Sequence, residues 1–206
     1  EKIKNSSRVA VPGCYPTGFL AVVYPLVTAG ILPKDYPVVC HAVSGYSGGG
    51  KAMIAEYEAV RTVKRLFSPR QYALTQSHKH QPEMQKIAGL EYTPIFNPMV
   101  GDFYSGMTVS VPIFTRLLSK KVGISDVKEA LKAHYSSEKM VRVMEYSENA
   151  IFAQEISGKN HLEIFVFGND ERIQLMSRLD NLGKGASGAA VQCFNIMNGF
   201  EEDRGL

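Results

Sequence analysis

The chain has few cysteines, and its first residues do not predict a targeting segment. Its 206 residues include three cysteines, at positions 14, 40 and 193. An odd, small number of cysteines argues against a disulfide-stabilised secreted scaffold and favours free thiols in a reducing compartment. The first seven residues are polar and lack the apolar core of a signal peptide. We therefore expect a cytoplasmic chain.

Long apolar runs and long runs of one charge are also missing. The most apolar stretch, residues 18–32, covers 15 residues and contains Pro25 and Gly30, so it is too short and too interrupted to cross a membrane. The net charge is +3, and basic residues form pairs such as Lys120-Lys121 instead of a continuous stripe. Neither a membrane nor a nucleic acid is expected as a partner.

Repeats and low-complexity linkers are absent, and the length is sufficient for a sizeable core. Residues 1–8 read as a polar lead-in. Strands mixed with helices, without regular alternation, predict an α+β fold with a mixed or antiparallel sheet and flanking helices. Strands are predicted at 8–11, 37–43, 93–100, 107–114, 140–146, 150–156 and 162–167, and helices at 17–30, 51–66, after residue 80, at 125–134 and at 186–198. The 51–66 helix would present Met53, Ile54, Tyr57, Val60 and Val63 on one face.

Two glycine motifs resemble nucleotide-binding signatures but lack the required context. Residues 45–51 fit the G-x-x-x-x-G-K pattern, yet Ala52 stands where a P-loop has a magnesium-binding hydroxyl. Residues 183–188 fit G-x-G-x-x-G, yet too few residues follow for the strand and acidic residue of a dinucleotide-binding fold. We expect a glycine loop that can bind a small anion, and a turn that leads into the last helix.

Cys14 is the candidate nucleophile. It lies in a Pro-Gly-Cys-Tyr-Pro turn before a helix, where the turn exposes the thiol and the helix N-terminus lowers its pKa. The alternative is a buried, inert cysteine. Cys40 and Cys193 are expected to be core residues, and His134 and His161 to be incidental.

The densest titratable cluster is residues 78–83, His-Lys-His-Gln-Pro-Glu. A histidine of pKa about 6.5 can transfer protons at neutral pH, and a carboxylate can orient it. The H-x-H spacing also occurs in zinc sites on strands, but a third ligand among Cys40, His41 and Glu83 stands at no recognisable spacing. Two surface histidines before a proline-capped helix are the structural alternative. The residues alone favour a Cys–His pair for acyl or thioester chemistry.

Four motifs in the same order resemble one family. The motifs are residues 9–18 around Cys14, residues 44–51, residues 78–83, and residues 179–188 with Val191, Gln192 and Asn195. From about residue 1 to residue 206 the chain resembles N-acetyl-γ-glutamyl-phosphate reductase, the NADP-dependent enzyme of arginine biosynthesis, in its shorter bacterial form. The resemblance implies the catalytic and dimerisation domain, of the type seen at the C-terminus of glyceraldehyde-3-phosphate dehydrogenase.

The resemblance also implies a role for each motif. Cys14 would attack the γ-acyl phosphate of N-acetyl-γ-glutamyl phosphate to give a thioester, which hydride from NADPH reduces to N-acetylglutamate γ-semialdehyde. His80 would be the general acid and base, with His78 as its neighbour or as a second candidate. No metal is implied. The other site residues would be Ser44, Gly45, Tyr46, His78 and Glu83 at the substrate, and Asn181 near the nicotinamide.

Two departures from the family pattern affect these expectations. Val11 stands where the family usually has asparagine before the Pro-Gly-Cys turn, and the family's N-terminal dinucleotide-binding domain does not precede Cys14 here. We therefore expect the isolated chain to bind NADPH poorly and not to turn over. Residues 180–206 would pack on that domain, so an apolar face is expected to be exposed or repacked: Ala189, Ala190, Cys193, Phe194 and Met197.

A homodimer or homotetramer is expected. Three other interpretations stay open: an aspartate-semialdehyde dehydrogenase, a Cys–His acyltransferase or hydrolase that needs no nicotinamide, and a non-catalytic oligomerisation fragment.

Overall fold

A computed structural model describes residues 1–59 and 63–206. Within these residues seven strands form one sheet in the order β2-β3-β1-β4-β7-β6-β5. The pairs β1–β3 and β5–β6 are parallel and the other pairs antiparallel, which confirms the predicted α+β fold with a mixed sheet. The strands are β1 (Val39–Gly45), β2 (Arg70–Gln71), β3 (Ile95–Gly101), β4 (Met107–Phe114), β5 (Val141–Val143), β6 (Leu162–Gly168) and β7 (Arg172–Leu179).

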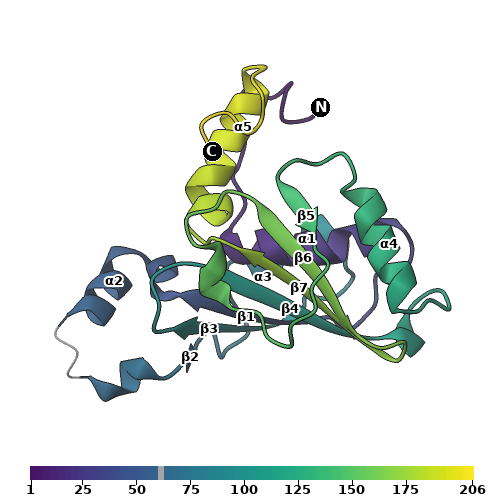
Figure 1. The fold of residues 1–206 in the computed structure, drawn as a ribbon, viewed down its shortest axis with the longest axis horizontal. Helices are drawn as coiled ribbons and strands as arrows, with labels where there is room; N and C mark the ends of the chain where they lie inside the picture. The colour runs from purple at the N-terminus through teal and green to yellow at the C-terminus, as the bar shows by residue number, and fades with distance from the viewer. Residues whose placement is uncertain (60–62) are drawn as a thin grey trace.

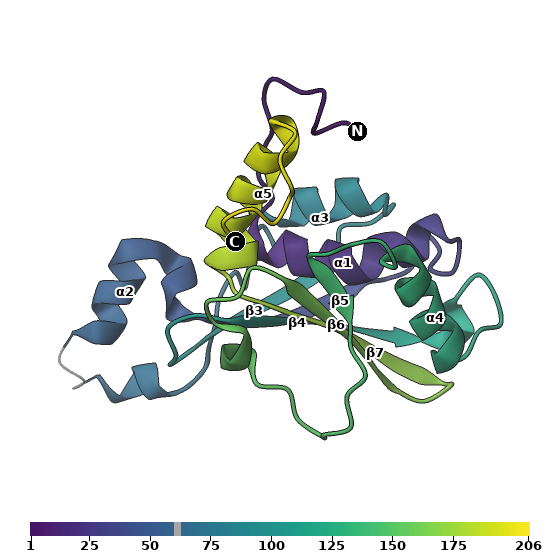
Figure 2. The same cartoon turned by 45° about the horizontal axis from the view of Figure 1, so that its top comes forward.

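Helices cover one face of this sheet (Figures 1 and 2). Figure 2 shows α1, α3 and α4 on one side, while α5 stands at one end of the sheet and α2 projects beyond the β2 edge. The α-helices are α1 (Cys14–Thr28), α2 (Gly50–Glu58), α3 (Gln81–Ala88), α4 (Ile124–His134) and α5 (Gly188–Met197). Short 3-10 turns are η1 (Tyr46–Gly49), η2 (Lys64–Phe67), η3 (Thr115–Leu117) and η4 (Ala153–Ile156), and a π-helical turn, η5 (Gly183–Ser187), precedes α5.

The core lies between α1 and the central strands. Alternate residues of β4 are fully buried from Met107 to Ile113, and they belong to the same apolar cluster as Phe19, Val22 and Leu26 of α1. On β4 every second residue is buried, and on α1 the buried residues recur at helical spacing. The sequence pattern predicts this arrangement. Cys40 lies in this core, as expected, and burial raises its pKa strongly.

A proline inside α1 is accommodated by the side chain of the residue that follows α4. Pro25 has no N–H to donate, so the carbonyl oxygen of Ala21, one turn earlier, lacks its helical partner. The hydroxyl of Tyr135, directly after α4, donates to that oxygen at 2.9 Å. This bond satisfies the orphaned carbonyl and ties α4 to the helix that begins at Cys14.

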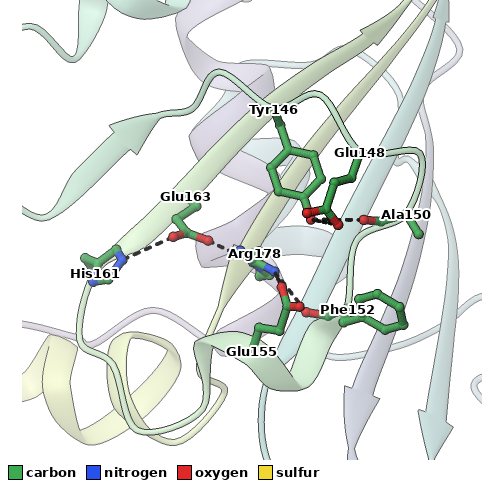
Figure 3. Close-up of polar contacts among 8 residues, drawn as sticks. All are labelled: Tyr146, Glu148, Ala150, Phe152, Glu155, His161, Glu163 and Arg178. Atoms are coloured by element: carbon green, nitrogen blue, oxygen red, sulfur yellow. Dashed lines mark hydrogen bonds and ion pairs between the residues drawn. The ribbon is translucent and has the colours of Figure 1, made fainter.

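The segment 144–156 crosses the opposite face of the sheet, below the strands in Figure 2. Figure 3 shows how it is held there: Arg178 of β7 donates to Glu163 of β6 at 2.8 Å, to Glu155, and to the carbonyl oxygen of Phe152 at 3.1 Å. The His161 imidazole lies 3.4 Å from Glu163. Because the guanidinium is nearly buried, these contacts satisfy a charge that would otherwise be costly to remove from water.

Three predicted elements differ from the structure, and one long strand was not predicted. Residues 8–11 form no strand, and the 51–66 helix ends at Glu58; Val60 lies outside the described residues. The 150–156 run contains a 3-10 turn instead of a strand, and the sequence reading missed β7. Cys193 is only partly buried on α5, where a core position was expected. None of the described helices is long and apolar enough to cross a membrane.

Candidate active site

Three strand ends bring the predicted motifs together at one end of the sheet. In the strand register Ser44 pairs with Val100 and with Met107, and Met107 pairs with Leu179. The glycine loop therefore follows β1 at the same end as the Asp180-Asn181 segment that follows β7. This juxtaposition depends on sheet order and cannot be read from sequence spacing.

Cys14 is the first residue of α1, with Gly13 as the N-cap. The Cys14 side chain is largely enclosed, and this burial is the main reason that its pKa is raised. Backbone N–H groups of the helix start and the charge of Lys79 act in the opposite direction, but they are smaller effects. The sequence-based expectation of a lowered pKa is therefore wrong for the protein without substrate, in which the thiol is protonated at neutral pH.

The His80 ring packs against Gly13. A methyl group added at Gly13 would lie 2.8 Å from Cδ2 and 2.9 Å from Cε1 of His80, closer than carbon atoms approach. Gly13 has an ordinary extended backbone, so the ring, and not backbone strain, is what requires glycine there. Burial, with smaller contributions from His78 and Lys79, lowers the pKa of His80 to about 4. The imidazole against Gly13, the residue before Cys14, is therefore neutral at pH 7.

The turn that carries the two histidines is fixed by its own hydrogen bonds. The backbone N–H of His80 donates to Nδ1 of His78 at 3.2 Å, so a neutral His78 carries its proton on Nε2. The His78 N–H donates to Oε1 of buried Gln81 at 2.8 Å, and Nε2 of Gln81 donates to the Pro94 carbonyl at 3.0 Å. Glu83 accepts the Gly13 N–H at 3.3 Å, which connects α3 to the start of α1.

Two tyrosines that the sequence analysis did not select complete the surroundings of Cys14. The Tyr72 hydroxyl donates to the Tyr15 hydroxyl at 3.0 Å, and the Tyr15 side chain also interacts with that of Ser44. The Tyr15 ring lies 5.9 Å from the His80 ring and 6.3 Å from the His78 ring, centroid to centroid. The position of Tyr15 beside Cys14 was the only sequence signal for it.

The glycine loop, residues 44–51, begins next to this aromatic group, at the Ser44 side chain that interacts with Tyr15. Ser44, Gly45 and Tyr46 are all buried, and the Tyr46 ring stacks on Tyr57 of α2 with centroids 4.7 Å apart. A methyl group at Gly45 would lie 2.6 Å from the carbonyl carbon of Tyr104, so close backbone packing requires glycine. The proposed substrate contacts of these three residues stay predictions.

Asn181 supports the glycine loop from the other side. It is buried, its Oδ1 accepts the Gly106 N–H at 2.8 Å, and its Nδ2 donates to the Ser47 hydroxyl at 2.9 Å. Both polar atoms of the side chain thus bond within the protein. The predicted position of Asn181 near a nicotinamide stays a prediction, and its observed contact is to the loop.

The histidines and cysteines do not assemble a metal centre in the described part of the chain. No group of three or more His, Cys, Asp or Glu side chains is placed to hold a metal ion among residues 1–59 and 63–206. Residues 78–80 form a turn before α3 instead of the strand that the H-x-H zinc interpretation required.

The fold and the site define a mixed-sheet domain with a cysteine thiol at the start of a helix. Cys14 begins a helix, the neutral His80 ring packs against the preceding Gly13, and Lys79 supplies positive charge nearby. The family described as "Semialdehyde dehydrogenase, dimerisation domain" matches residues 14–181. The chain belongs to the semialdehyde dehydrogenase family.

The similar sequences have a more specific name. A protein of Nostoc sp. (strain PCC 7120 / SAG 25.82 / UTEX 2576) named "N-acetyl-gamma-glutamyl-phosphate reductase 2" is 43% identical over the whole of this chain and 68% of its own length. A Sinorhizobium medicae protein named "N-acetyl-gamma-glutamyl-phosphate reductase" is 46% identical over 95% of this chain and 66% of its own length. The chain thus spans about two thirds of the length of these relatives.

Solved structures confirm the fold. Aspartate semialdehyde dehydrogenase II from Vibrio cholerae has a TM-score of 0.68 at 20% identity, over 91% of this chain and 61% of that one. Aspartate semialdehyde dehydrogenase from Francisella tularensis has a TM-score of 0.67 at 14% identity, over 91% of this chain and 64% of that one. At these identities the similarity establishes the fold alone.

Proposed function

We propose that the chain is the catalytic domain of an N-acetyl-γ-glutamyl-phosphate reductase, which converts the acyl phosphate to N-acetylglutamate γ-semialdehyde and phosphate. The observation that carries the proposal is the position of Cys14 at the start of α1, with His80 against the preceding glycine. The names of the relatives supply the substrate. We assign Cys14 as the nucleophile and His80 as the base.

The acyl-transfer step uses groups of this chain only. The Cys14 sulfur attacks the γ-carbonyl carbon, a carbon–sulfur bond forms, the carbon–oxygen bond to phosphorus breaks, and phosphate leaves. His80 receives the thiol proton, which it can do because its ring is neutral at pH 7. An anionic acyl phosphate beside the ring would raise the pKa of His80 and favour this proton transfer.

Charge near the thiol suits a phosphorylated substrate. Lys79 is exposed and lies close enough to lower the pKa of Cys14. We propose that its ammonium attracts the substrate phosphate, so that Lys79→Gln raises KM more than it lowers kcat. The matched control is Lys86→Gln, on the exposed last turn of α3.

Completion of the reaction requires a nicotinamide cofactor. When bound, NADPH supplies the hydride that reduces the thioester to the aldehyde and frees the thiol. The Asn181 side chain bonds to the glycine loop and to Gly106, and we assign most of the cofactor contacts to a dinucleotide-binding domain. We assign the partly exposed apolar side of α5, including Phe194, to packing on that domain.

Self-association fits the sheet face that α1, α3 and α4 leave uncovered. Side chains there include exposed Ile95 of β3 and Phe114 of β4, whereas their strand neighbours Phe96 and Ile113 point into the core. We propose that a second copy covers this face, in agreement with the description of the family as a dimerisation domain. Light scattering coupled to size-exclusion chromatography tests this.

The reductase assay tests the whole proposal. The chain joined to a dinucleotide-binding domain is expected to reduce NADP in the reverse direction with N-acetylglutamate semialdehyde and phosphate, and Cys14→Ser is expected to abolish this. Preference for aspartate semialdehyde would favour an aspartate-semialdehyde dehydrogenase instead. Thioester hydrolysis without nicotinamide would favour a Cys–His hydrolase, and NADP-dependent turnover by the chain alone would contradict the need for a second domain.

A further inference from the structure

The second glycine motif of the sequence forms an unusual turn beside the active-site cysteine. Residues 183–187 adopt a π-helical turn, η5, between Asn181 and α5. The Gly185 N–H donates to the Asp180 carbonyl at 2.8 Å, and the Ser187 N–H to the Leu182 carbonyl at 2.8 Å. Turns of this type are rare and occur often at functional sites.

Gly185 packs directly on the nucleophile. A methyl group added there would lie 2.8 Å from Cβ of Cys14, 3.3 Å from its Cα, and 3.1 Å from the Asp180 carbonyl oxygen. All three atoms belong to the backbone or are bonded directly to it, so none can rotate away. Any side chain at residue 185 must therefore move either the turn or the start of α1.

The Asp180 carboxylate holds the end of the turn that lies next to the sheet. Asp180 is buried, and its Oδ1 accepts the Leu182 N–H at 2.8 Å and the Gly183 N–H at 3.3 Å. Its Oδ2 accepts the N–H of Gly158. These bonds connect the first residues of the turn to the end of β7.

The other side of the turn is fixed to α5. The Lys184 side chain is buried, and its ammonium donates to the Gln192 side chain on α5. The Gln192 amide in turn donates to Glu202 at 2.8 Å. A shift of α5 would therefore pull on residue 184, next to the glycine that contacts Cys14.

We propose that Gly185 is a positioning residue for Cys14, and that the turn 183–187, anchored through Lys184 and Gln192, transmits the position of α5 to the thiol. This inference rests on the proposed role of Cys14 as the nucleophile. It assigns a function to the glycine motif other than dinucleotide binding.

The expected consequence is a change in thiol reactivity. The turn covers one side of Cys14, and burial is the main cause that raises its pKa. If the turn is displaced, the thiol gains contact with water and becomes more acidic. Each unit by which the pKa falls increases the thiolate fraction about tenfold at pH values below the pKa.

Alkylation by iodoacetamide, followed across pH with peptide mapping, measures this. We expect Gly185→Ala to lower the pH midpoint of Cys14 and to raise its rate at pH 7 by about threefold or more. Gln192→Ala, which does not contact Cys14, is expected to act in the same direction. The controls are Ala186→Ser, which adds an atom on the exposed side of the turn, and Val191→Ala on the exposed side of α5.

Cys40 serves as an internal control, because its thiol is fully buried and reacts only if the fold opens. An unchanged Cys14 rate in Gly185→Ala, with Cys40 protected, overturns the proposal. If Gly185→Ala exposes Cys40, Gln192→Ala decides, and an unchanged Cys14 rate there overturns it. If Cys14 of the wild-type protein reacts only when Cys40 also reacts, the result counts against Cys14 as the nucleophile. Faster labelling of Cys14 in the variants would still support the covering role of the turn.

Discussion

The contact between Gly13 and His80 gives a quantitative test of the site geometry. Gly13→Ala places a methyl group within 3 Å of two carbon atoms of the His80 ring, at a backbone conformation that alanine adopts without strain. The ring has little room to move, because its own backbone is the N-cap of α3 and the Tyr15 ring packs against it with centroids 5.9 Å apart. Overpacking of this kind costs about 1–3 kcal/mol of unfolding free energy.

The cost should disappear when the ring is removed. In Gly13→Ala/His80→Ala the methyl group has space, so the double variant should be more stable than the sum of the single changes predicts, with a coupling energy of about 1–2 kcal/mol. Urea unfolding followed by circular dichroism measures all four proteins, since the chain has no tryptophan. Val11→Ala, at an exposed position in the same segment, is the matched control.

Additive effects of the two substitutions would refute this reasoning. They would mean that the His80 ring does not pack on the residue before Cys14, and the assignment of His80 as the base would then lose its geometric support. Coupling confined to the Gly13 and His80 pair would support it.

Three further predictions concern stability. The pKa of His80 is about 4 in the folded chain and about 6.5 in the unfolded chain. Its contribution to the free energy of unfolding is therefore complete above pH 6.5 and is lost as the pH falls toward 4. Urea midpoints measured across pH should show a loss of about 1 kcal/mol, and a smaller loss in His80→Asn. Arg178→Met leaves Glu163 nearly buried without its partner and should cost about 3 kcal/mol, whereas Arg172→Met, on the exposed end of the same strand, should cost less than about 0.5; equal costs would contradict the network. Gly106→Ala adds a methyl group 2.9 Å from the Ala153 carbonyl carbon, at a residue whose φ of +99° disfavours alanine. Thermal unfolding should show a loss of at least about 2 kcal/mol in the free energy of unfolding. A neutral effect would contradict the close packing of the 144–156 segment.

The strands and helices with clear apolar periodicity were predictable from sequence. The run 107–114 forms β4 with the predicted bounds, and α4 begins one residue before the predicted position, with Asp126 accepting the Gly123 N–H at 2.8 Å. Such elements bury one face, so their pattern records their packing.

The missed strand β7 shows where pattern reading fails. Its polar residues Gln174, Ser177 and Arg178 interrupt the apolar run, so the segment does not read as a core strand. Arg178 is nevertheless buried, because Glu163 and Glu155 pair with it from elements distant in sequence. Tertiary pairing of this kind leaves no local signal.

The candidate site was predictable in its residue types but not in its electrostatics. Sequence motifs selected Cys14, the first residue of α1, and His80, the N-cap of α3, whose ring packs against Gly13. The predicted direction of the Cys14 pKa shift was wrong. The sequence showed the helix N-terminus, but it did not show that Gly185 and the surrounding rings cover the thiol. Enclosure is a property of the assembled fold.

The most direct test of the central claim is to trap the acylated thiol. The protein is exposed briefly to an acyl phosphate such as acetyl phosphate, and its cysteine peptides are analysed by mass spectrometry. The account predicts an acyl group on Cys14 that neutral hydroxylamine removes, no adduct at residue 14 in Cys14→Ser, and slower formation in His80→Asn. Acylation spread equally over Cys14 and Cys193, or absent from Cys14, would contradict the assignment of Cys14 as the nucleophile.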